Sequence, residues 1–293
     1  MTNRKLLMLS GLGGFTLCAL VLAIGWLVWT GNIWQIFGGN NELYAGRTII
    51  TGQRDETRIP GFKAALLDVA KKVSGNQMLT AAQIETIVHG NIKLFVQDFT
   101  DRDRMEDIPI HDEQGTRDRS FELLINFVPS RVNAMLRSLG EKPWKETRPK
   151  VLVLVNVHNA IGSYILTDDE DDETGAEQRE AFKAAAWQTG IPLILPLPPL
   201  LKTGNVDTKS LDQLSPRQIG DLRRMAQADA VITGNLIWVG GPNGWKANWI
   251  LHDDKGEHRW QIEGINFDGA FRNAMRGAAQ ILSQHGEPPP NLN

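Results

Sequence analysis

Residues 151–157 read Val-Leu-Val-Leu-Val-Asn-Val, and this stretch decides the fold class. An aliphatic run of strand length, without the alternation of a half-exposed strand, is typical of a strand covered on both faces. Strands of this kind form the centre of sheets that carry helices on both sides. We therefore expect an α/β body built around residues 151–157.

Helix and strand signals alternate downstream of this strand. They predict a helix over 177–187, a short strand over 191–195, a helix that begins at Ser215 with Gln218 in a capping box, strands over 230–239, 245–251 and 259–265, and a final helix through 271–282. Turns rich in Gly, Asn and Asp join the last three strands into an antiparallel meander. We assign 151–285 to an α/β domain and 286–293 to a Pro-rich tail.

The stretch upstream, 42–140, predicts a smaller α+β domain. Its expected elements are a strand over 44–51, a helix preceded by Pro60 and Gly61, a helix capped by Thr80 and Gln83, strands over 93–100 and 121–127 separated by a polar loop over 101–118, and a helix from Pro129. Residues 141–150 form a connector between the two domains. The whole body is thus expected to be mixed α/β (α+β).

A second decisive stretch lies at the N-terminus, where residues 6–29 contain no charged side chain. At about 1.5 Å per residue, this run makes a helix of about 36 Å, longer than a hydrocarbon core of about 30 Å. Arg4 and Lys5 precede it, and the next basic residue is Arg47. The positive-inside rule then keeps residues 1–5 in the cytoplasm and exports the body, with 30–41 as a linker.

Trp26, Trp29 and Trp34 cluster at the outer end of this run, where an aromatic belt holds a helix at headgroup depth. A cleaved signal peptide is a weaker alternative, because its apolar core is usually about 7–15 residues long. A lipoprotein anchor at Cys18 is disfavoured by Leu17 before it, and a buried core helix by the absence of a polar face. Whether the helix is removed stays open.

Small residues recur along one side of the predicted helix. Ser10, Gly14 and Cys18 are four residues apart, a spacing that lets two helices approach closely. Small residues are also common in spanning helices without such a role. Self-association, or docking in a membrane complex, is therefore one hypothesis for this helix.

Composition excludes several function classes. A net charge of −3 and one cysteine, Cys18, leave the body without a basic footprint for nucleic acid and without a thiol for a disulfide, a nucleophile or a metal site. Residues 240–244 are rich in glycine, but they join two strands, whereas a phosphate loop runs from a strand into a helix. We expect no cofactor.

Ordered fragments of the body resemble a known family. They are the segment 58–66 (Arg-Ile-Pro-Gly-Phe-Lys-Ala-Ala-Leu), Val73-Ser74-Gly75, the strand 121–127, Trp144 with Arg148-Pro149, the strand that follows, Ala228-Asp229-Ala230-Val231 and Gly244-Trp245. Together they look like the bacterial family known as domain of unknown function 2066, over roughly 42–249. The resemblance implies an exported or membrane-anchored protein of Gram-negative bacteria. It supplies no activity and no residue role.

Two histidine sites are weak candidates. His252 and His258 flank the turn 253–257, and both face a metal if they point to the same side of the hairpin. An exposed hairpin tip is the simpler interpretation. His158 ends the central strand beside Asn156 and Asn159, at the kind of strand end where α/β sheets bind ligands.

Three further features have both a functional and a structural interpretation. Ser163 and Asp168 lie downstream of His158, but no Gly-x-Ser-x-Gly elbow is present. The acidic run 168–173 is interpreted as a solvated loop rather than a calcium site, because no glycine interrupts it. The tryptophans of the meander form either an aromatic binding face or, as we favour, part of the core.

These observations predict a membrane-anchored protein of the inner membrane whose body faces the periplasm. The expected function is a non-catalytic binding or accessory module, with membrane lipid and an envelope protein as partners and no nucleic acid. Two alternatives stay open. One is an envelope hydrolase or metal-dependent enzyme, and the other is a scaffold subunit of an inner-membrane complex.

Overall fold

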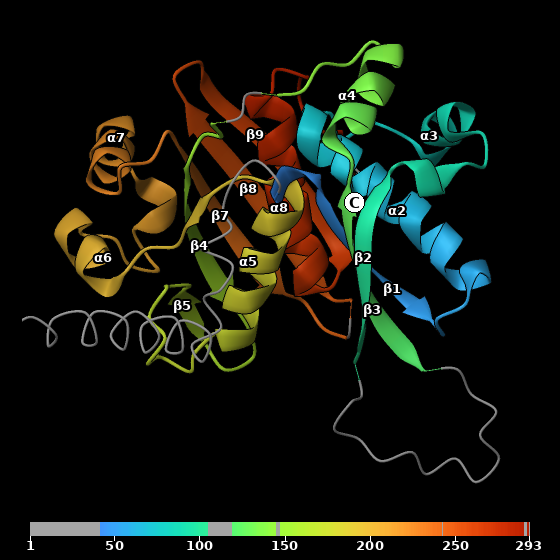
Figure 1. The fold of residues 1–293 in the computed structure, drawn as a ribbon. Coiled ribbons are helices and arrows are strands. Elements are labelled where there is room, and N and C mark those ends of the chain that lie inside the picture. Colours follow the sequence, from blue (N-terminus) through green and yellow to red (C-terminus); the bar gives the residue numbers. More distant parts are fainter. Residues whose placement is uncertain (1–41, 105–118, 145–146, 242, 290–291, 293) are drawn as a thin grey trace, which may run out of the picture. The chain divides into compact units, whose positions relative to one another are not determined.

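The structure is a computed structural model that describes residues 42–104, 119–144, 147–241, 243–289 and 292. The described residues after Glu42 belong to one compact unit (Figure 1). In the described residues it contains two sheets and seven α-helices, which confirms the mixed fold class. The predicted division at 141–150 into two domains stays a prediction.

The predicted membrane segment lies outside the described residues. This holds for the helix 6–29, the linker 30–41 and the residues assigned to them, namely Ser10, Gly14, Cys18, Trp26, Trp29 and Trp34. Among the helices that the structure does describe, none has the length and apolar character needed to cross a bilayer.

The first sheet is antiparallel and has the order β1-β3-β2, with β1 at Ala45–Thr51, β2 at Val96–Asp103 and β3 at Ser120–Phe127. Helices α2 (Asp55–Ser74), α3 (Ala81–Val88) and α4 (Pro129–Ser138) share a core with it. That core contains Phe62, Leu66, Val69, Leu123, Ile125, Phe127, Val132 and Leu136. The predicted strand over 121–127 is confirmed.

Helix α2 begins earlier than the sequence predicted. Pro60 was expected to precede the helix, but it lies inside, five residues after the first helical residue Asp55. Proline at this position removes only the bond to the carbonyl of Glu56, near an end where carbonyl and N–H pairing is incomplete anyway. Asp55 and Glu56 compensate because negative charge is favourable at a helix N-terminus.

Strand β2 was also misplaced, since the sequence predicted a strand over 93–100 and a loop from residue 101. The strand instead ends at Asp103, and Lys93 belongs to a 3-10 turn, Ile92–Leu94. Arg58 of α2 forms an ion pair with Asp101, and Arg119 binds Asp103 at 2.6 Å. These partners let two carboxylates remain in a strand that their polarity alone disfavours.

Both predicted capping boxes are confirmed. At Thr80 and at Ser215 the side-chain oxygen accepts from the backbone N–H three residues on, and the glutamine there bonds back to the capping residue. The second box opens α7 (Pro216–Met225). Each box satisfies helix N–H groups that have no partner inside the helix.

The second sheet has six strands, in the order β5-β4-β7-β8-β9 with β6 also paired to β4. Their bounds are β4 Val151–His158, β5 Ser163–Ile165, β6 Leu193–Ile194, β7 Ala230–Trp238, β8 Trp245–Asp253 and β9 Gly256–Ile265. Strand β4 runs parallel to β6 and β7, and β7, β8 and β9 form the predicted antiparallel meander.

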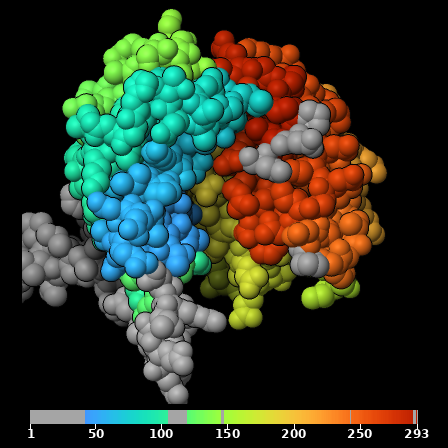
Figure 2. All heavy atoms as spheres, turned by 90° about the vertical axis from the view of Figure 1, so that its right-hand side faces the viewer, coloured from blue at the N-terminus to red at the C-terminus, as the bar shows by residue number. Residues whose placement is uncertain are grey.

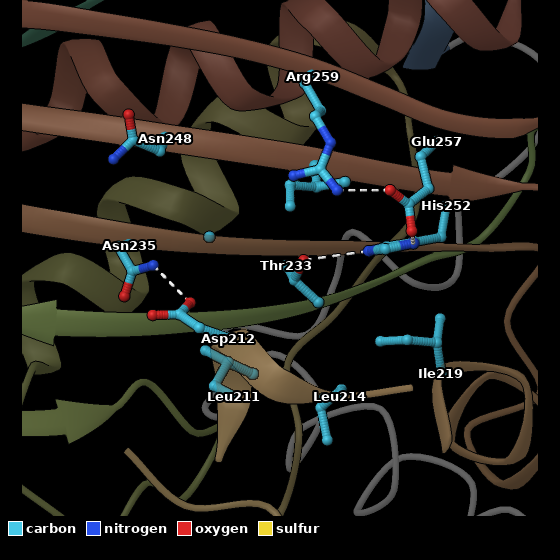
Figure 3. Close-up of a pocket in the computed structure, with 12 residues that line it drawn as sticks. Leu211, Asp212, Leu214, Ile219, Thr233, Asn235, Asn248, His252, Glu257 and Arg259 are labelled. Atoms are coloured by element: carbon cyan, nitrogen blue, oxygen red, sulfur yellow. Dashed lines mark hydrogen bonds and ion pairs between the residues drawn. The ribbon is translucent and has the colours of Figure 1, made fainter. Parts of the chain in front are cut away.

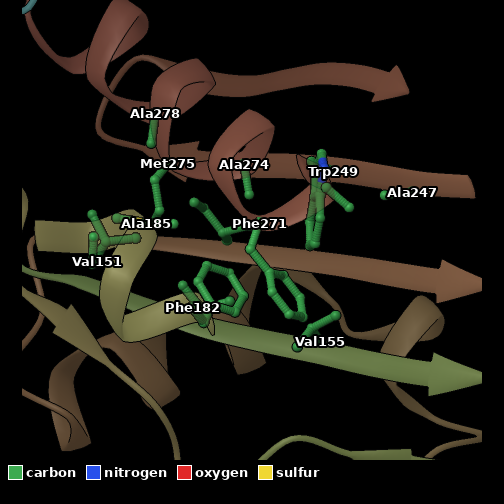
Figure 4. Close-up of a cluster of buried hydrophobic side chains, with 14 of the residues drawn as sticks. Val151, Val155, Phe182, Ala185, Ala247, Trp249, Phe271, Ala274, Met275 and Ala278 are labelled. Atoms are coloured by element: carbon green, nitrogen blue, oxygen red, sulfur yellow. The ribbon is translucent and has the colours of Figure 1, made fainter. Parts of the chain in front are cut away.

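Strand β4 is buried on both faces, as the sequence predicted. Its odd-numbered valines from 151 to 157 pack under α5 (Ala176–Thr189) and α8 (Phe267–Leu282), where Phe182, Phe271 and Trp249 fill the core (Figure 4). Leu152 and Leu154 pack on the opposite face against α7. Helix α6 (Pro198–Gly204) borders α7 on that side and was not predicted.

Contacts join the first-sheet elements to the C-terminal ones, which lie beside each other in Figure 2. The backbone N–H of Gln77 donates to Gln280 Oε1 at 2.8 Å. The ammonium of Lys72 lies 3.8 Å from the centre of the Trp187 ring. Buried Arg148 of the connector donates to the carbonyl of Lys72 at 3.0 Å, while burial lowers the pKa of this guanidinium to about 10.

A glycine pair tests the packing of the second sheet. A Cβ on Gly234 of β7 would lie 2.3 Å from the Trp249 ring, so we expect Gly234→Ala to lower the free energy of unfolding by about 1–3 kcal/mol. Gly220 of α7 has no neighbour within 4 Å of an added Cβ, and Gly220→Ala should raise stability by about 0.5–1 kcal/mol. Urea unfolding of the two variants measures both; equal effects would contradict this packing.

Candidate functional site

Strand register aligns polar side chains on one face of the second sheet. We call it the α7 face, because α7 packs on its β4 end, and it carries the even-numbered residues of β4. There Asn156 pairs with Asn235 of β7, Asn235 with Asn248 of β8, and Asn248 with Gln261 of β9. Paired residues point to the same face, so these four side chains form an amide row across four strands.

The amide row runs from the protein interior to solvent. Asn156 is fully buried, and its Nδ2 donates to the carbonyl of Thr208 at 2.8 Å, while its Oδ1 has no hydrogen-bond partner among the described residues. At the other end, Gln261 is exposed. In the part of the chain that the structure describes, the helices of this face pack on β4 and β7, and the outer half of the row, with half-buried Asn248 and exposed Gln261, is accessible.

A cleft of about 270 Å³ lies between the residues that cover β7 and the open strands β8 and β9 (Figure 3). Its apolar wall comes from η4 (Leu211–Gln213) and the following residues through α7, namely Leu211, Leu214 and Ile219. Its polar side chains come from η4 and the three meander strands, namely Asp212, Thr233, Asn235, Asn248, His252, Glu257 and Arg259. The cleft therefore has one apolar side and one side with donors and acceptors.

His252 links several of these groups. Its Nε2 lies 3.1 Å from Thr233 Oγ1, and its Nδ1 lies 3.5 Å from Glu257 Oε1. Arg259 donates to the second oxygen of Glu257 at 2.5 Å. Burial lowers the pKa of His252 below its ordinary value of 6.5, Glu257 opposes this shift, and Arg259 adds to it. Neutral His252 thus sits beside an already paired carboxylate.

A second chain of hydrogen bonds runs from the cleft to the end of β4. Asn235 Nδ2 donates to Asp212 Oδ1 at 2.7 Å, which leaves Asn235 Oδ1 as the acceptor for His158 Nε2–H at 3.2 Å. The other ring nitrogen of His158 then accepts from the Ser163 hydroxyl at 2.8 Å. The α7 face thus carries both His158 and Asn156, which the sequence assigned to one crevice, and His252, which it assigned to a separate hairpin site.

Asn159, the third residue of the predicted crevice, has a structural role. Its Oδ1 accepts from the N–H groups of Ile161 and Gly162 at 2.9 and 3.1 Å, and so closes the turn between β4 and β5. It belongs to the rim of the sheet and does not line the cleft.

His252 and His258 point to opposite faces of the hairpin. His252 pairs with Glu257, whereas His258 pairs with Leu251, and a one-residue offset in a strand reverses the face. His258 instead contacts Glu287 at 2.5 Å. One ion cannot bind both imidazoles in this arrangement. In the described residues, no group of three His, Cys, Asp or Glu side chains is arranged to hold a metal.

The remaining candidates follow their simpler interpretations. Trp245, Trp249 and Trp260 are buried in the core under α5 and α8, whereas Trp238 is exposed. In the acidic run 168–173, Asp168 binds Lys183 at 3.0 Å. The glycine-rich segment after β7 leads into β8 rather than into a helix.

Sequence reasoning missed most of the cleft residues, among them Asp212, Asn235 and Asn248. A signal was present in β8, where polar Lys246, Asn248 and His252 alternate with apolar residues. It did not reveal which polar residues share a row, because that depends on register between strands.

Comparisons with known proteins add a partial family match. The model of a family described as "Domain of unknown function (DUF8605)" matches residues 39–145, about a third of the chain. This family differs from domain of unknown function 2066, so the resemblance drawn from the sequence fragments was wrong. The fragments are short, and none of them is a motif that is specific to a single family. The matched segment ends before β4 and leaves the cleft outside it.

No curated protein matches the chain. Two solved structures from Paraburkholderia phytofirmans have some similarity to it. One is the dodecamer of a PelC variant, with 17% identity over 46% of this chain and 86% of that chain and a TM-score of 0.21. The other is a PelC dodecamer, with 15% identity over 46% of this chain and 87% of that chain and a TM-score of 0.19.

The lowered pKa of His252 predicts a pH dependence of stability. Folding resists the protonation of His252, whereas the unfolded chain takes up the proton below about pH 6.5, so its contribution is complete above that pH and is lost as pH falls. His252→Gln should therefore make the free energy of unfolding fall less steeply between pH 7 and pH 5 than in the wild type. Urea unfolding at pH 7, 6 and 5 measures this.

Asn248→Gln provides the matched control, because it alters the same cleft without a titrating group. The free energy of unfolding of Asn248→Gln should fall between pH 7 and pH 5 as steeply as that of the wild type. If the free energies of unfolding of His252→Gln and of the wild type have the same pH dependence, the lowered pKa of His252 is contradicted.

Proposed function

We propose that this protein is a membrane-anchored module of the cell envelope that binds a segment of a protein partner in the cleft on the α7 face. The main support for this proposal is the amide row. The covering helices leave its outer half open, and Asn235 and Asn248 of the row line a cleft of about 270 Å³. The binding role is non-catalytic. The N-terminal helix keeps the body at the periplasmic side of the inner membrane.

The side chains of the cleft favour a polypeptide ligand. An amide carries a donor and an acceptor, as a peptide group does, so Asn248 and Gln261 can pair with a backbone that crosses the strands. Leu214 and Ile219 offer an apolar wall to its side chains. Glu257 already pairs with Arg259, whereas the Asp212 carboxylate accepts only from the neutral Asn235 amide and keeps its negative charge. An anionic ligand therefore fits less well than a neutral polypeptide backbone.

The anchor is supported by sequence. Residues 6–29 are uncharged, basic residues precede them, and tryptophans follow toward the outer end. The partner then belongs to the same compartment as the body, which is why an envelope protein is proposed.

Photo-crosslinking in intact cells tests the binding proposal. A photoreactive residue in place of Gln261 should capture one discrete protein, and adding Asn248→Ala should reduce the yield about fivefold, the effect of one hydrogen bond of about 1 kcal/mol. Asn248 lines the cleft, and its side chain makes no hydrogen bond to another described residue that the substitution would break.

Two controls define the outcome. The same photoreactive residue in place of exposed Arg137 on α4 should capture no such protein, and Gln178→Ala on α5 should leave the Gln261 yield unchanged. Equal capture of the protein from positions 261 and 137 would contradict binding through this cleft. A crosslinking yield that Asn248→Ala leaves unchanged would contradict it as well.

A hydrolase is the second candidate, and one observation favours it. Ser163 Oγ lies 2.8 Å from His158 Nδ1, and Asn235 orients the imidazole, which is the arrangement of a nucleophile, a base and an orienting group. Against it, the N–H groups of Ile161 and Gly162 beside Ser163 both donate to Asn159. They are not free to stabilise an oxyanion.

Ser163→Ala distinguishes the two candidates. The binding proposal expects this variant to retain the Gln261 crosslink and the cellular phenotype of the wild type, because Ser163 does not line the cleft. A fluorophosphonate probe that labels the wild-type protein, with labelling lost in Ser163→Ala, would support the hydrolase instead.

A further inference from the structure

Two loops leave the second sheet next to each other and expose apolar side chains. Strands β4 and β7 are parallel, and His158, the last residue of β4, pairs with Ile237, one residue before the end of β7, so the segments that follow start side by side. Ile161 in the first segment is 97% exposed. In the second, Val239 is 70% exposed, and Trp238, the last residue of β7, is 39% exposed. We call these three side chains the apolar tip.

Charge is absent from both segments. Residues 151–167 and 235–245 contain no Asp, Glu, Lys or Arg, in a chain where these residues make up 22%. An ordinary solvated loop carries polar and charged residues, and the other large exposed apolar side chains of the described residues include isolated ones such as Met78 and Leu197. The apolar tip therefore needs a partner that accepts uncharged, apolar side chains.

Trp238 fits the boundary between an apolar phase and water. Its indole Nε1–H donates to the carbonyl of Gly241 at 3.2 Å, so the polar atom is satisfied within its own loop while part of the ring stays exposed. Tryptophan is enriched at membrane surfaces because its ring is apolar and its N–H is polar.

We infer that the apolar tip rests on the lipid surface of the membrane that anchors the chain. The inference depends on the anchor of the proposed function. Residues 30–42 separate the apolar run from the compact unit, and thirteen residues reach at most about 45 Å. A body of this size has a radius of gyration of about 18 Å, so the tether holds it within roughly one body diameter of the bilayer. At that distance the nearest extended apolar surface is the bilayer.

The acidic run 168–173 belongs to the segment that follows β5, and the apolar tip brings no cation. Contact therefore depends on apolar insertion and not on attraction to anionic lipid. It should be the same on vesicles of neutral phosphatidylcholine and at high salt.

Site-directed labelling of the full chain tests this inference. The chain has one cysteine, so Cys18→Ser provides a background for single labels. The protein is inserted through its own anchor into phosphatidylcholine nanodiscs, and a fluorophore is placed at Ile161→Cys or Val239→Cys. Nitroxide carried by the lipid should quench these labels at least threefold more than labels at Met78→Cys or Leu197→Cys, which are also exposed.

The outcomes separate the inference from the anchor. If the protein does not co-purify with nanodiscs, the anchor has failed, and the apolar tip has lost the membrane that it needs. If it co-purifies and the labels at 161 and 239 are quenched no more than those at 78 and 197, the tip does not contact lipid, while the anchor stands. As a second readout, Trp238→Ser should reduce quenching of the 161 label at least twofold, and Leu197→Ser should not.

Discussion

The register that joins β4, β7, β8 and β9 is the constraint on which the rest of the structure depends. With four strands aligned, alternate residues divide into two sets, and each set has one environment. One set packs under α5 and α8 and forms the larger core, with Phe182, Phe271 and Trp249. The other set faces α7, where the apolar residues of β4 are covered and the polar residues of β8 and β9 are not. A slip of one residue would bury Asn248 and expose Trp249.

The same constraint accounts for the cleft. Helices cover the β4 side of the α7 face because Leu152, Leu154 and Val231 need apolar neighbours, and Ile219 and Leu222 of α7 supply them. The covering helices end where the face becomes polar. Covering Asn248 and Arg259 with an apolar helix would leave buried polar groups without partners, at about 1–3 kcal/mol for each. The cleft is the boundary between a part of the sheet that must be covered and a part that must stay wet or bind another polar chain.

Local sequence predicted the elements well where one residue type determines them. The valines of β4, the capping boxes at Thr80 and Ser215 and the Gly-, Asn- and Asp-rich turns of the meander are of this kind. It failed where distant partners decide. Asp101 joins a strand because Arg58 reaches it from α2, and the three residues of β5 are a strand only because β4 lies beside them. The candidate site shows the same limit. His158 and Asn156 were predicted at a strand end, but the hydrogen bonds from His158 through Asn235 to Asp212 depend on the register between β4 and β7.

The central claim is that the open half of the α7 face is occupied by a partner in the cell. Cysteine accessibility measures occupancy directly. In a Cys18→Ser background, Gln261→Cys reports on the face and Arg137→Cys on exposed α4 serves as the reference. A small, membrane-impermeant maleimide should modify position 261 at least tenfold more slowly in intact cells than in the purified protein, with position 137 equally fast in both. Equal rates at position 261 in cells and in the purified protein would contradict the claim.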